Sequence, residues 1–514
     1  MTPLLNMGQA VSLHAHLSPE KIGARDLSRA MTFQQWEARS RRLANGLLGL
    51  GLAKGDRVAI LAYNCVEWLE IYAATALAGL VMVPINFRLT GPEIAYIVGN
   101  SEAKALICQA DFVEVVAGIR ADLSIAADHY IHFGGAVPPS WIGYEALLSA
   151  AADHAPDVDV RPEDTWAFIY TSGTTGKPKG AMRSHASHAL LGLATFADLE
   201  LTRRDTALLV MPMCHANSLF FASAFTYGGA ACCVYDAKSF EPEHLLATLA
   251  TEKATFTSLV PTHYIMMLGL PDAVKSKYDV DSVSKLLISS APARRDTKLA
   301  IMAHFRNSHL LEMYGSSEAG WATLLRPDEQ LTNLGSVGRE LTGCRPIKLL
   351  DETGGEVADG DVGEIYTYTP WCFDGYWKLP EKTAEAFRGP YLSVGDLGRR
   401  DAEGFIHLVD RKNNMIISGG ENIYPSEIEN LLGSHPAIKD VAVIGKPHDK
   451  WGEAVHAVIV LRDGVTCGET ELLGWCAGKI AGYKRPRSVS FIPDTEMPRT
   501  ATGKILHRVL KGRI

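Results

Sequence analysis

The amino-acid sequence predicts an α/β fold, with a large N-terminal domain of βαβ units in parallel sheets and a small α+β C-terminal domain. Three observations support this prediction. Strand-like and helix-like stretches alternate over most of the first 335 residues, short strands with glycine-containing turns follow, and a third pattern begins near residue 411. Alternating strands and helices are typical of parallel sheets, because a parallel strand pair needs a crossover connection. A chain of 514 residues also exceeds one hydrophobic core.

The first part of the chain contains two runs of this alternation. Thr32 precedes an apolar helical pattern, so we expect it to cap a helix that runs through the 40s. The other expected elements of the first run are strands at 57–61, 81–85 and 105–107, with a helix at 66–80. The second run comprises strands at 166–170, 207–211, 230–235, 256–259 and 285–288, with helices at 218–227 and 241–252.

The remaining residues have a different organisation. Short antiparallel strands are expected at 346–350, 363–367 and 404–408, with a turn at 351–354. A compact α+β module then runs to the end, with helices at 425–433 and 469–481 and strands at 440–445, 454–461 and 488–492. These changes predict an N-terminal domain at 1–410, a hinge at 411–414 and a C-terminal domain at 415–514.

Composition excludes several classes of protein. The net charge of −8 argues against a nucleic-acid partner, although the basic C-terminal end suits an anionic ligand. The nine cysteines are odd in number and form no C-x-x-C, which argues against a disulfide framework or a zinc site and fits a reducing compartment. The N-terminus has no signal pattern, and Gly79 and Pro84 interrupt the apolar stretch at 71–85. We therefore expect a cytoplasmic protein without a transmembrane segment.

The stretch Tyr170–Gly180 contains three glycines, several hydroxyl residues and two lysines, directly after an expected strand. Glycines let backbone N–H groups converge on one point, hydroxyls can bind Mg²⁺, and lysines add positive charge, so the stretch suits a polyphosphate. It is not a Walker A loop, because only two residues separate Gly173 from Gly176. Its composition alone would equally suit a mobile turn.

Three later motifs also carry chemistry. Tyr314–Gly320 differs from a serine-hydrolase elbow at Ala319, so the alternative is an aromatic residue that covers a purine, followed by Glu318 as a carboxylate for Mg²⁺. Asp396 and Arg411 could bind the two hydroxyls of a ribose or form a surface ion pair. Lys504 ends the stretch Pro498–Lys504 near the C-terminus, where an isolated lysine would normally be solvated.

Together these motifs resemble those of the adenylate-forming superfamily, which contains acyl-CoA synthetases, luciferases and peptide-synthetase adenylation domains. The resemblance covers nearly the whole chain, with the motifs in family order. It implies a small distorted β-barrel beside the parallel sheets and a mobile C-terminal domain. It also implies the two steps of an AMP-forming acid–thiol ligase. A carboxylate and Mg²⁺·ATP give an acyl-adenylate and pyrophosphate, and a thiol then gives a thioester and AMP.

The resemblance assigns roles to individual residues. The implied catalytic residues are Lys504, Glu318, Thr175 and His215. Lys504 is the adenylation lysine, Glu318 and Thr175 also hold Mg²⁺, and His215 is an orienting or gating residue. The implied ATP and AMP site comprises Thr171, Ser172, Gly173, Thr174, Thr175, Gly176, Lys177, Lys179, Ser290, Ala291, Pro292, Met313, Tyr314, Gly315, Ser316, Ser317, Asp396, Arg411 and Lys504. Candidates for the acyl pocket, each of which could instead be a core residue, are His215, Asn217, Phe220, Val260, Tyr264 and Trp321. The implied CoA contacts are Gly419, Gly420, Trp451, Tyr483, Arg485 and Arg487, and Asn413 is the hinge residue.

Three positions depart from the family pattern. Ser317 stands where threonine is usual, Ser289-Ser290 stands where two glycines are usual, and Asn413 stands where lysine or aspartate is usual. The two serines would narrow one wall of the adenine site. Asn413 leaves the hinge prediction intact but the role of its side chain open.

The resulting hypothesis is an acyl-CoA synthetase that uses ATP, Mg²⁺ and CoA and acts on a medium-chain fatty, alicyclic or aromatic carboxylic acid. The basic C-terminal end favours CoA as the acceptor. Two alternatives remain: an enzyme that loads a separate carrier protein, and a nucleotide-binding relative that has lost catalysis. The sequence does not specify an oligomeric state, and a homodimer is compatible with it.

Overall fold

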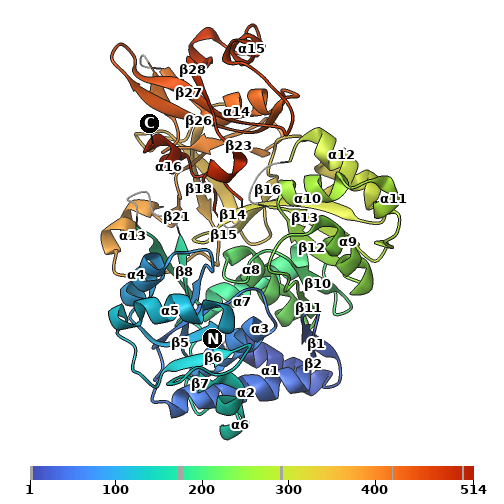
Figure 1. Ribbon diagram of the computed structural model, residues 1–514, viewed down its shortest axis with the longest axis vertical. Helices are drawn as coiled ribbons and strands as arrows, with labels where there is room; N and C mark the ends of the chain where they lie inside the picture. Colours follow the sequence, from blue (N-terminus) through green and yellow to red (C-terminus); the bar gives the residue numbers. More distant parts are fainter. Residues whose placement is uncertain (1–3, 172–176, 290–292, 419–420, 501–502, 514) are drawn as a thin grey trace. The chain divides into compact units, whose positions relative to one another are not determined.

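The computed structural model describes residues 4–171, 177–289, 293–418, 421–500 and 503–513 (Figure 1). The chain divides into two compact units. The larger unit comprises Met1–Pro346 and Thr367–Leu392, and the smaller unit comprises Ile347–Tyr366 and Ser393–Ile514. This division does not test the predicted domain boundaries at 410 and 415, which stay predictions.

One sheet of the larger unit carries the start of the stretch Tyr170–Gly180, called the phosphate loop below. Its strand order is β19-β9-β8-β4-β3-β5-β6-β7, parallel from β8 to β7 and antiparallel at β8–β9 and β9–β19. The strands are β3 (Arg57–Leu61), β4 (Val81–Ile85), β5 (Ala103–Gln109), β6 (Tyr130–Phe133), β7 (Ile142–Gly143), β8 (Thr165–Thr171), β9 (Lys179–Ser184) and β19 (Gly375–Tyr376). The parallel arrangement confirms the βαβ prediction for this part of the chain.

The second sheet of the larger unit has the order β16-β15-β14-β13-β12-β10-β11-β1-β2. Strands β14 to β1 pair in parallel, and antiparallel strands lie at both edges. The strands are β1 (Ile22–Arg25), β2 (Ala30–Thr32), β10 (Thr206–Leu209), β11 (Ala231–Val234), β12 (Phe256–Leu259), β13 (Lys285–Ile288), β14 (His309–Ser316), β15 (Gly320–Leu325) and β16 (Arg339–Glu340).

Helices cover these sheets and complete the core of the larger unit. One large apolar cluster joins residues of both sheets to α2, α3 and α8, including Trp36, Trp68 and Phe221. The helices are α1 (Met7–Leu17), α2 (Phe33–Gly49), α3 (Glu67–Ala78), α4 (Gly91–Ser101), α5 (Val113–Ile119), α6 (Tyr144–Ala150), α7 (His185–Asp198), α8 (Ala216–Gly228), α9 (Pro242–Thr251), α10 (Pro261–Leu268), α11 (Asp272–Lys275), α12 (Arg295–His304) and α13 (Pro380–Ala386).

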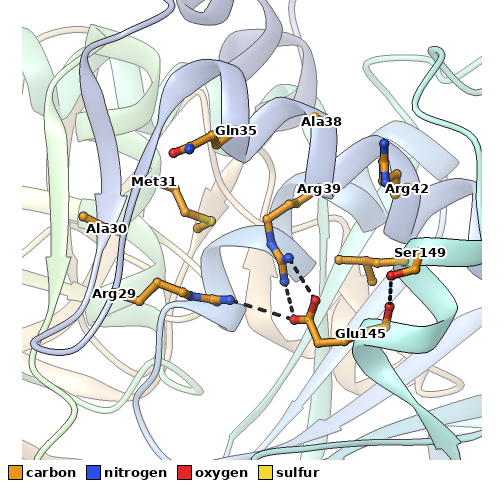
Figure 2. Close-up of a pocket in the computed structure, with 10 residues that line it drawn as sticks. Arg29, Ala30, Met31, Gln35, Ala38, Arg39, Arg42, Glu145 and Ser149 are labelled. Atoms are coloured by element: carbon orange, nitrogen blue, oxygen red, sulfur yellow. Dashed lines mark hydrogen bonds and ion pairs between the residues drawn. The ribbon is translucent and has the colours of Figure 1, made fainter.

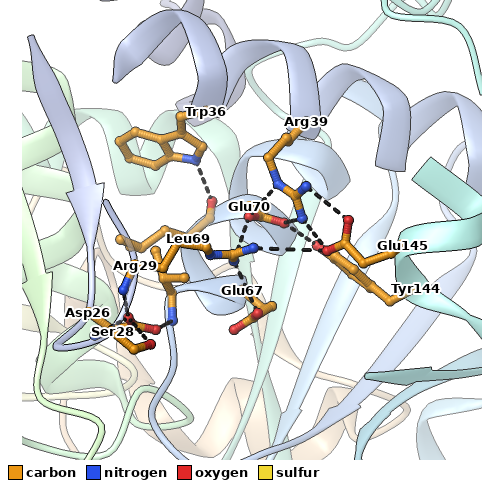
Figure 3. A network of polar contacts seen from close by, with 11 residues as sticks. Asp26, Ser28, Arg29, Trp36, Arg39, Glu67, Leu69, Glu70, Tyr144 and Glu145 are labelled. Carbon is orange, nitrogen blue, oxygen red and sulfur yellow. Dashed lines mark hydrogen bonds and ion pairs between the residues drawn. The ribbon is translucent and has the colours of Figure 1, made fainter. Parts of the chain in front are cut away.

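Helix α3 is buried on every side, and its single buried carboxylate is fully paired. Glu70 lies 2.9 Å from an Arg29 nitrogen and 2.8 Å from Arg39 Nε, and Tyr144 donates a hydrogen bond to it at 2.7 Å (Figure 3). Burial raises the pKa of Glu70, and the two arginines oppose that shift. Because a buried charge is costly without partners, this network ties α2 and α6 to α3.

The boundary between the units runs through β18 (Gly363–Tyr368). In the larger unit, Thr367 pairs with Leu392 of β21 (Tyr391–Leu392), which also pairs with β20 (Phe387–Arg388). In the smaller unit, Gly363 and Glu364 pair with β22 (Asp396–Arg400), which pairs with β23 (Ile406–Arg411). These antiparallel pairs, with β17 (Arg345–Leu350), confirm the change of pattern predicted after residue 335.

The C-terminal part of the smaller unit is an α+β module with its own apolar core, which includes Ile428, Val443 and Ile459. Its sheet has the order β25-β24-β27-β26, and β28 pairs with β27 in parallel. The elements are β24 (Ile416–Ser418), β25 (Glu421–Ile423), α14 (Pro425–Gly433), β26 (Ile438–His448), β27 (Gly452–Leu461), α15 (Glu469–Trp475), β28 (Ser488–Phe491) and α16 (His507–Lys511).

Several local predictions are confirmed, whereas one helix was predicted to be longer than it is. Thr32 caps α2, because its hydroxyl accepts from Gln35 N at 3.2 Å while the Gln35 side chain accepts from Thr32 N. The helix predicted at 469–481 ends at Trp475. Gly478 follows with a φ of 74°, a backbone conformation that no regular helix contains. Within the described residues, none of the helices is both long enough and apolar enough to span a bilayer.

Candidate active site

Ten of the predicted site residues lie outside the described residues. They are Ser172, Gly173, Thr174, Thr175 and Gly176 of the phosphate loop, Ser290, Ala291 and Pro292 of the predicted adenine site, and Gly419 and Gly420 of the implied CoA contacts. The structure nevertheless describes the residues on either side of the phosphate loop. Thr171 and Lys179 are direct partners in the antiparallel β8–β9 pair, so residues 172–178 connect two hydrogen-bonded strands.

The Glu318 carboxylate lies close to this strand pair. Glu318 is 7% exposed, and its Oε1 accepts hydrogen bonds from the Tyr376 hydroxyl at 2.9 Å and from Thr171 Oγ1 at 3.3 Å. The Lys179 ammonium lies 3.9 Å from the centre of the Tyr376 ring. Burial lowers the pKa of Lys179, and the negative charge of Glu318 opposes that shift. Glu318, Thr171 and Lys179, which the resemblance assigns to the metal and nucleotide site, therefore lie in one cluster.

This donor set fits a hard divalent cation bound to a polyphosphate. Mg²⁺ prefers carboxylate and hydroxyl oxygens, and phosphates supply its remaining ligands. Glu318 provides a buried carboxylate, and Lys179 provides a cation nearby for the phosphates. Thr175, the other predicted metal ligand, lies outside the described residues.

Arg183 is a buried residue that the sequence analysis missed. It lies on β9 and donates to the carbonyls of Ser317 at 2.8 Å, Glu318 at 3.3 Å and Trp371 at 2.6 Å. Burial lowers the pKa of Arg183 to about 10. The guanidinium therefore shapes the turn after β14 that carries Glu318. The detectable signal was a charged residue inside the otherwise uncharged stretch Gly180–Ser184.

The predicted adenine segment Met313–Ser317 lies at the end of β14, where β14 and β15 approach closely. A Cβ atom added to Gly315 would lie 2.1 Å from the carbonyl oxygen of Gly320. Met313 is buried, Tyr314 is half-buried, and the register of the strand pair shifts between Tyr314 and Gly315. Glycine at 315 is therefore required by the backbone of the neighbouring strand, and the approach fixes the position of Tyr314.

Two of the acyl-pocket candidates contact each other. Phe220 and Trp321 meet edge to face with ring centres 5.7 Å apart. Asn217 donates instead to the hydroxyls of Ser258 at 3.1 Å and Ser289 at 2.9 Å. Ser258 was not predicted from the sequence.

The two acyl-pocket candidates Val260 and Tyr264 are buried at the start of α10. Tyr264 is fully buried in a different apolar cluster from Phe220, and its hydroxyl donates to the Leu287 carbonyl. Val260 is buried just before α10.

His215 precedes α8 and is half-buried. Desolvation of its ring, together with the positive charge of Arg88, lowers the pKa of His215 to about 4. The same charge acts on His263. His215 is therefore neutral at pH 7. Arg88, which follows β4, was not predicted to lie near it.

In the smaller unit, the two predicted ribose ligands lie together. Asp396 and Arg411 are direct partners across β22 and β23, and Arg411 Nε lies 2.9 Å from Asp396 Oδ1. Lys504 lies within the electrostatic reach of both. The crowded surroundings of its ammonium and the charge of Arg411 lower the pKa of Lys504 to about 8, against the opposing charges of Asp396 and Asp410. The residue as a whole is exposed, so this desolvation acts on the ammonium at the end of the side chain.

The predicted CoA contacts lie on an exposed part of the smaller unit. The Arg487 guanidinium lies 5.1 Å from the centre of the Trp451 ring. Tyr483 and Arg485 are exposed in and beside the turn at Gly482–Lys484. Asn413 is exposed between β23 and β24. Basic and aromatic side chains of this kind suit phosphates and a purine.

Two other features do not add to this site. A surface pocket of about 350 Å³ contains Arg29, Arg39 and Arg42, but each arginine is already paired with a carboxylate and no predicted site residue lines the pocket (Figure 2). In the smaller unit, donor atoms of His435, Cys467 and Glu471 lie within 4.8 Å of one another. His435 Nδ1 accepts from Ala437 N, which places the proton of a neutral imidazole on Nε2 and leaves that nitrogen no lone pair for a metal.

Comparisons with known proteins identify the family. The model of the AMP-binding enzymes matches residues 12–377, and that of their C-terminal domain matches residues 427–504. The chain is 34% identical to an indoleacetate–CoA ligase of Aromatoleum aromaticum over 98% of this chain and 96% of the relative. It is 35% identical to a feruloyl-CoA synthase of Amycolatopsis over 97% of both chains.

The crystal structure of the anthranilate CoA ligase AuaEII in complex with anthranoyl-AMP superposes with a TM-score of 0.90 at 26% identity. The match covers 100% of this chain and 98% of that one. The chain therefore belongs to the AMP-binding enzymes of the adenylate-forming superfamily. It is an AMP-forming acid–thiol ligase that acts through an acyl-adenylate, with ATP and CoA as substrates.

Proposed function

We propose that this ligase activates an aromatic carboxylic acid and transfers it to CoA. The observation that carries the proposal is the edge-to-face contact of Phe220 and Trp321, two buried aromatic rings in the predicted acyl region. Relatives named for indoleacetate and ferulate support the same substrate class. A fatty acid is the second candidate, because a long-chain-fatty-acid–CoA ligase of Mycobacterium tuberculosis is also 33% identical to this chain.

In the first step, a carboxylate oxygen of the acid attacks the α-phosphorus of ATP, and the bond to the β-phosphate breaks. Negative charge grows between two anions, so a cation there stabilises the transition state more than the ground state. We assign this cation to Lys504. Asp396 accepts hydrogen bonds from the ribose hydroxyls, and Arg411 holds the Asp396 carboxylate in place. Lys179 binds phosphate oxygens.

Glu318 would hold Mg²⁺, which neutralises phosphate charge and aligns the triphosphate when bound. Thr171 and Tyr376 keep the Glu318 carboxylate oriented. Arg183 donates hydrogen bonds to the backbone carbonyls of Ser317 and Glu318 and so holds the backbone of this turn. Together these contacts hold both the carboxylate and the backbone of Glu318 in one arrangement.

In the second step, the sulfur of CoA attacks the acyl carbon, the bond to the AMP oxygen breaks, and the thiol proton is released. We assign Arg487 and Trp451 to the nucleotide end of CoA and Gly419-Gly420 to its pantetheine arm. Movement of the C-terminal domain about the hinge at 411–414, which contains Asn413, would withdraw Lys504 from the reacting groups. The same movement would bring the Gly419-Gly420 loop to them. Neutral His215 can orient the acyl carboxylate without forming an ion pair with it.

The deciding experiment measures pyrophosphate release from Mg²⁺·ATP with benzoic, indoleacetic, hydroxycinnamic and C6–C16 fatty acids, each with and without CoA. Release that is fastest with an aromatic acid, together with its CoA thioester, is the expected result. Preference for a fatty acid would overturn the substrate class but not the reaction. Pyrophosphate without thioester would favour a carrier protein as the acceptor. ATP binding without any release would favour a silent relative.

We also infer a cytoplasmic location, because the nine cysteines are all free thiols, as in reducing compartments. Fractionation of expressing cells tests this location. A homodimer is tested by sedimentation of the purified chain, which distinguishes a mass near 56 kDa from twice that value.

A further inference from the structure

Tyr376 contacts two parts of the proposed Mg²⁺·ATP site with two parts of one side chain. Its hydroxyl donates to Glu318 Oε1 at 2.9 Å, and the face of its ring lies 3.9 Å from the Lys179 ammonium. Glu318 follows β14 and Lys179 begins β9, and they are far apart in sequence. Tyr376 is therefore a direct link between the carboxylate assigned to the metal and a lysine assigned to the phosphates.

The local structure holds Tyr376 in this position. Gly375 and Tyr376 form β19, which pairs with Met182 and Ala181 of β9. The Phe373 N–H donates to the Glu318 carbonyl at 2.7 Å. The same short segment, from 373 to 376, therefore contacts both the backbone and the carboxylate of Glu318.

The hydroxyl contact is the stronger of the two side-chain contacts to Glu318. Tyr376 donates at 2.9 Å, whereas Thr171 donates at 3.3 Å, near the limit for a hydrogen bond. Hydrogen bonds to a charged acceptor are stronger than those to a neutral one. The ring contact is different in kind, because it is an electrostatic attraction between the ammonium and the face of the aromatic ring. The Tyr376 ring therefore helps to fix the position of the Lys179 ammonium.

We propose that Tyr376 is a positioning residue for Mg²⁺·ATP, with its hydroxyl orienting the metal carboxylate and its ring orienting Lys179. This inference rests on the proposed function of Glu318 and Lys179. The plain alternative is that Tyr376 serves the core, because it is 5% exposed and packs in a small apolar cluster with Phe373 and Leu392. Removal of the hydroxyl alone separates the two, since phenylalanine keeps the apolar packing.

The experiment compares Tyr376→Phe and Tyr376→Leu with the unmodified enzyme. Tyr278→Phe is the matched control, because the Tyr278 hydroxyl donates to Glu243 at the same 2.9 Å, beside α9 and outside the proposed site. Binding of unlabelled ATP is measured by isothermal titration calorimetry at a series of Mg²⁺ concentrations, which requires no acyl substrate. Pyrophosphate release against Mg²⁺ and thermal unfolding are measured in parallel.

For Tyr376→Phe we expect the Mg²⁺ concentration at half-maximal nucleotide binding to rise roughly tenfold or more, the scale of one lost hydrogen bond to a carboxylate. Nucleotide affinity at saturating Mg²⁺ should stay within about twofold. Tyr376→Leu should show the same metal shift and also bind nucleotide about threefold more weakly at saturating Mg²⁺, because Lys179 loses the ring. Tyr278→Phe should match the unmodified enzyme in both measurements.

An unchanged Mg²⁺ midpoint in Tyr376→Phe overturns the inference, even if the enzyme forms acyl-CoA as proposed. Nucleotide binding by the unmodified enzyme that does not depend on Mg²⁺ overturns it as well. A Tyr376→Phe protein that unfolds at the assay temperature shows that the hydroxyl serves the fold, which also rejects the proposal. If the metal shift appears but no acid is turned over, the inference stands and the proposed substrate class fails.

Discussion

Asp396 and Arg411 are direct cross-strand partners in the β22–β23 pair, and their side chains form an ion pair of 2.9 Å. Asp396 is buried, whereas the Arg411 side chain is 43% exposed. The carboxylate is therefore held in one orientation by a cation that still reaches solvent. A carboxylate fixed in this way can accept both hydroxyls of a ribose without first losing conformational freedom.

Asp396→Asn should weaken nucleotide binding, because an amide accepts less strongly than a carboxylate and turns a donor toward Arg411. We expect the KM for ATP to rise about tenfold or more, which corresponds to the loss of about 1.4 kcal/mol. Asp401→Asn is the control. Asp401 pairs with His407 at 2.7 Å at the other end of the same strand pair, so its loss should leave the KM unchanged. Equal effects of both variants would assign Asp396 to the hairpin rather than to ATP.

Lys504→Ala should separate the two half-reactions. Adenylation, measured as pyrophosphate release, should fall by about 10²-fold or more, the scale of one lost transition-state donor. Thioester formation from a synthetic acyl-adenylate and CoA should stay near the normal rate. Lys511→Ala provides the control, since Lys511 forms a surface ion pair with Glu453 that is expected to contribute little. Equal loss of both half-reactions in Lys504→Ala would contradict this division of labour.

The pH dependence of adenylation should report the same lysine. Burial of the ammonium, with the charge of Arg411, lowers the pKa of Lys504 to about 8. The protonated form is the cation that stabilises the transition state, so the rate should fall as pH rises through about 8 and hold steady just below it. The rate of thioester formation should not show this fall, which we call the alkaline limb of the pH profile. The limb should also be absent from the residual activity of Lys504→Ala, and its persistence there would assign the titration to another group.

Gly315→Ala should destabilise the fold at the adenine segment. The added methyl would lie 2.1 Å from the Gly320 carbonyl oxygen, a backbone atom that cannot rotate away. We expect the free energy of unfolding to fall by about 1–3 kcal/mol, measured by denaturant titration, with a raised KM for ATP. Gly99→Ala is the matched control in helix α4, where a Cβ meets nothing within 4 Å. That variant should gain about 0.5–1 kcal/mol from helix propensity. Similar effects of the two substitutions would refute the steric argument.

Local structure was largely predictable because it depends on nearby residues. The strands at 57–61, 81–85, 256–259 and 285–288 and the helix at 425–433 have the predicted bounds. Thr32 caps its helix as expected, because the capping hydroxyl and its partner are three residues apart. The helix that begins at 469 was predicted too long, since an apolar pattern continued past Trp475 while glycines ended the helix.

The candidate site was predictable to the extent that its motifs are contiguous. The flanks of the phosphate loop, the turn with Glu318 and the segment with Lys504 were all found in the sequence. The pairing of Asp396 with Arg411 was one of two alternatives until the strand register brought them together. Contacts of Asn217 with Ser258 and Ser289 were not foreseen, because three separate strand and helix ends supply them.

The sequence by itself determined the family, the order of the motifs and the residue types available for each chemical role. Those properties depend on short stretches whose side chains must stay close along the chain. Only the tertiary structure decided which residues support the site from a distance. Tyr376 reaches Glu318 across 58 residues and Arg183 reaches it across 135, through strand pairing and burial that no local pattern records. Such long-range contacts form only when the whole sheet packs on its apolar core. Burial of apolar side chains there provides the free energy that holds the strands in register.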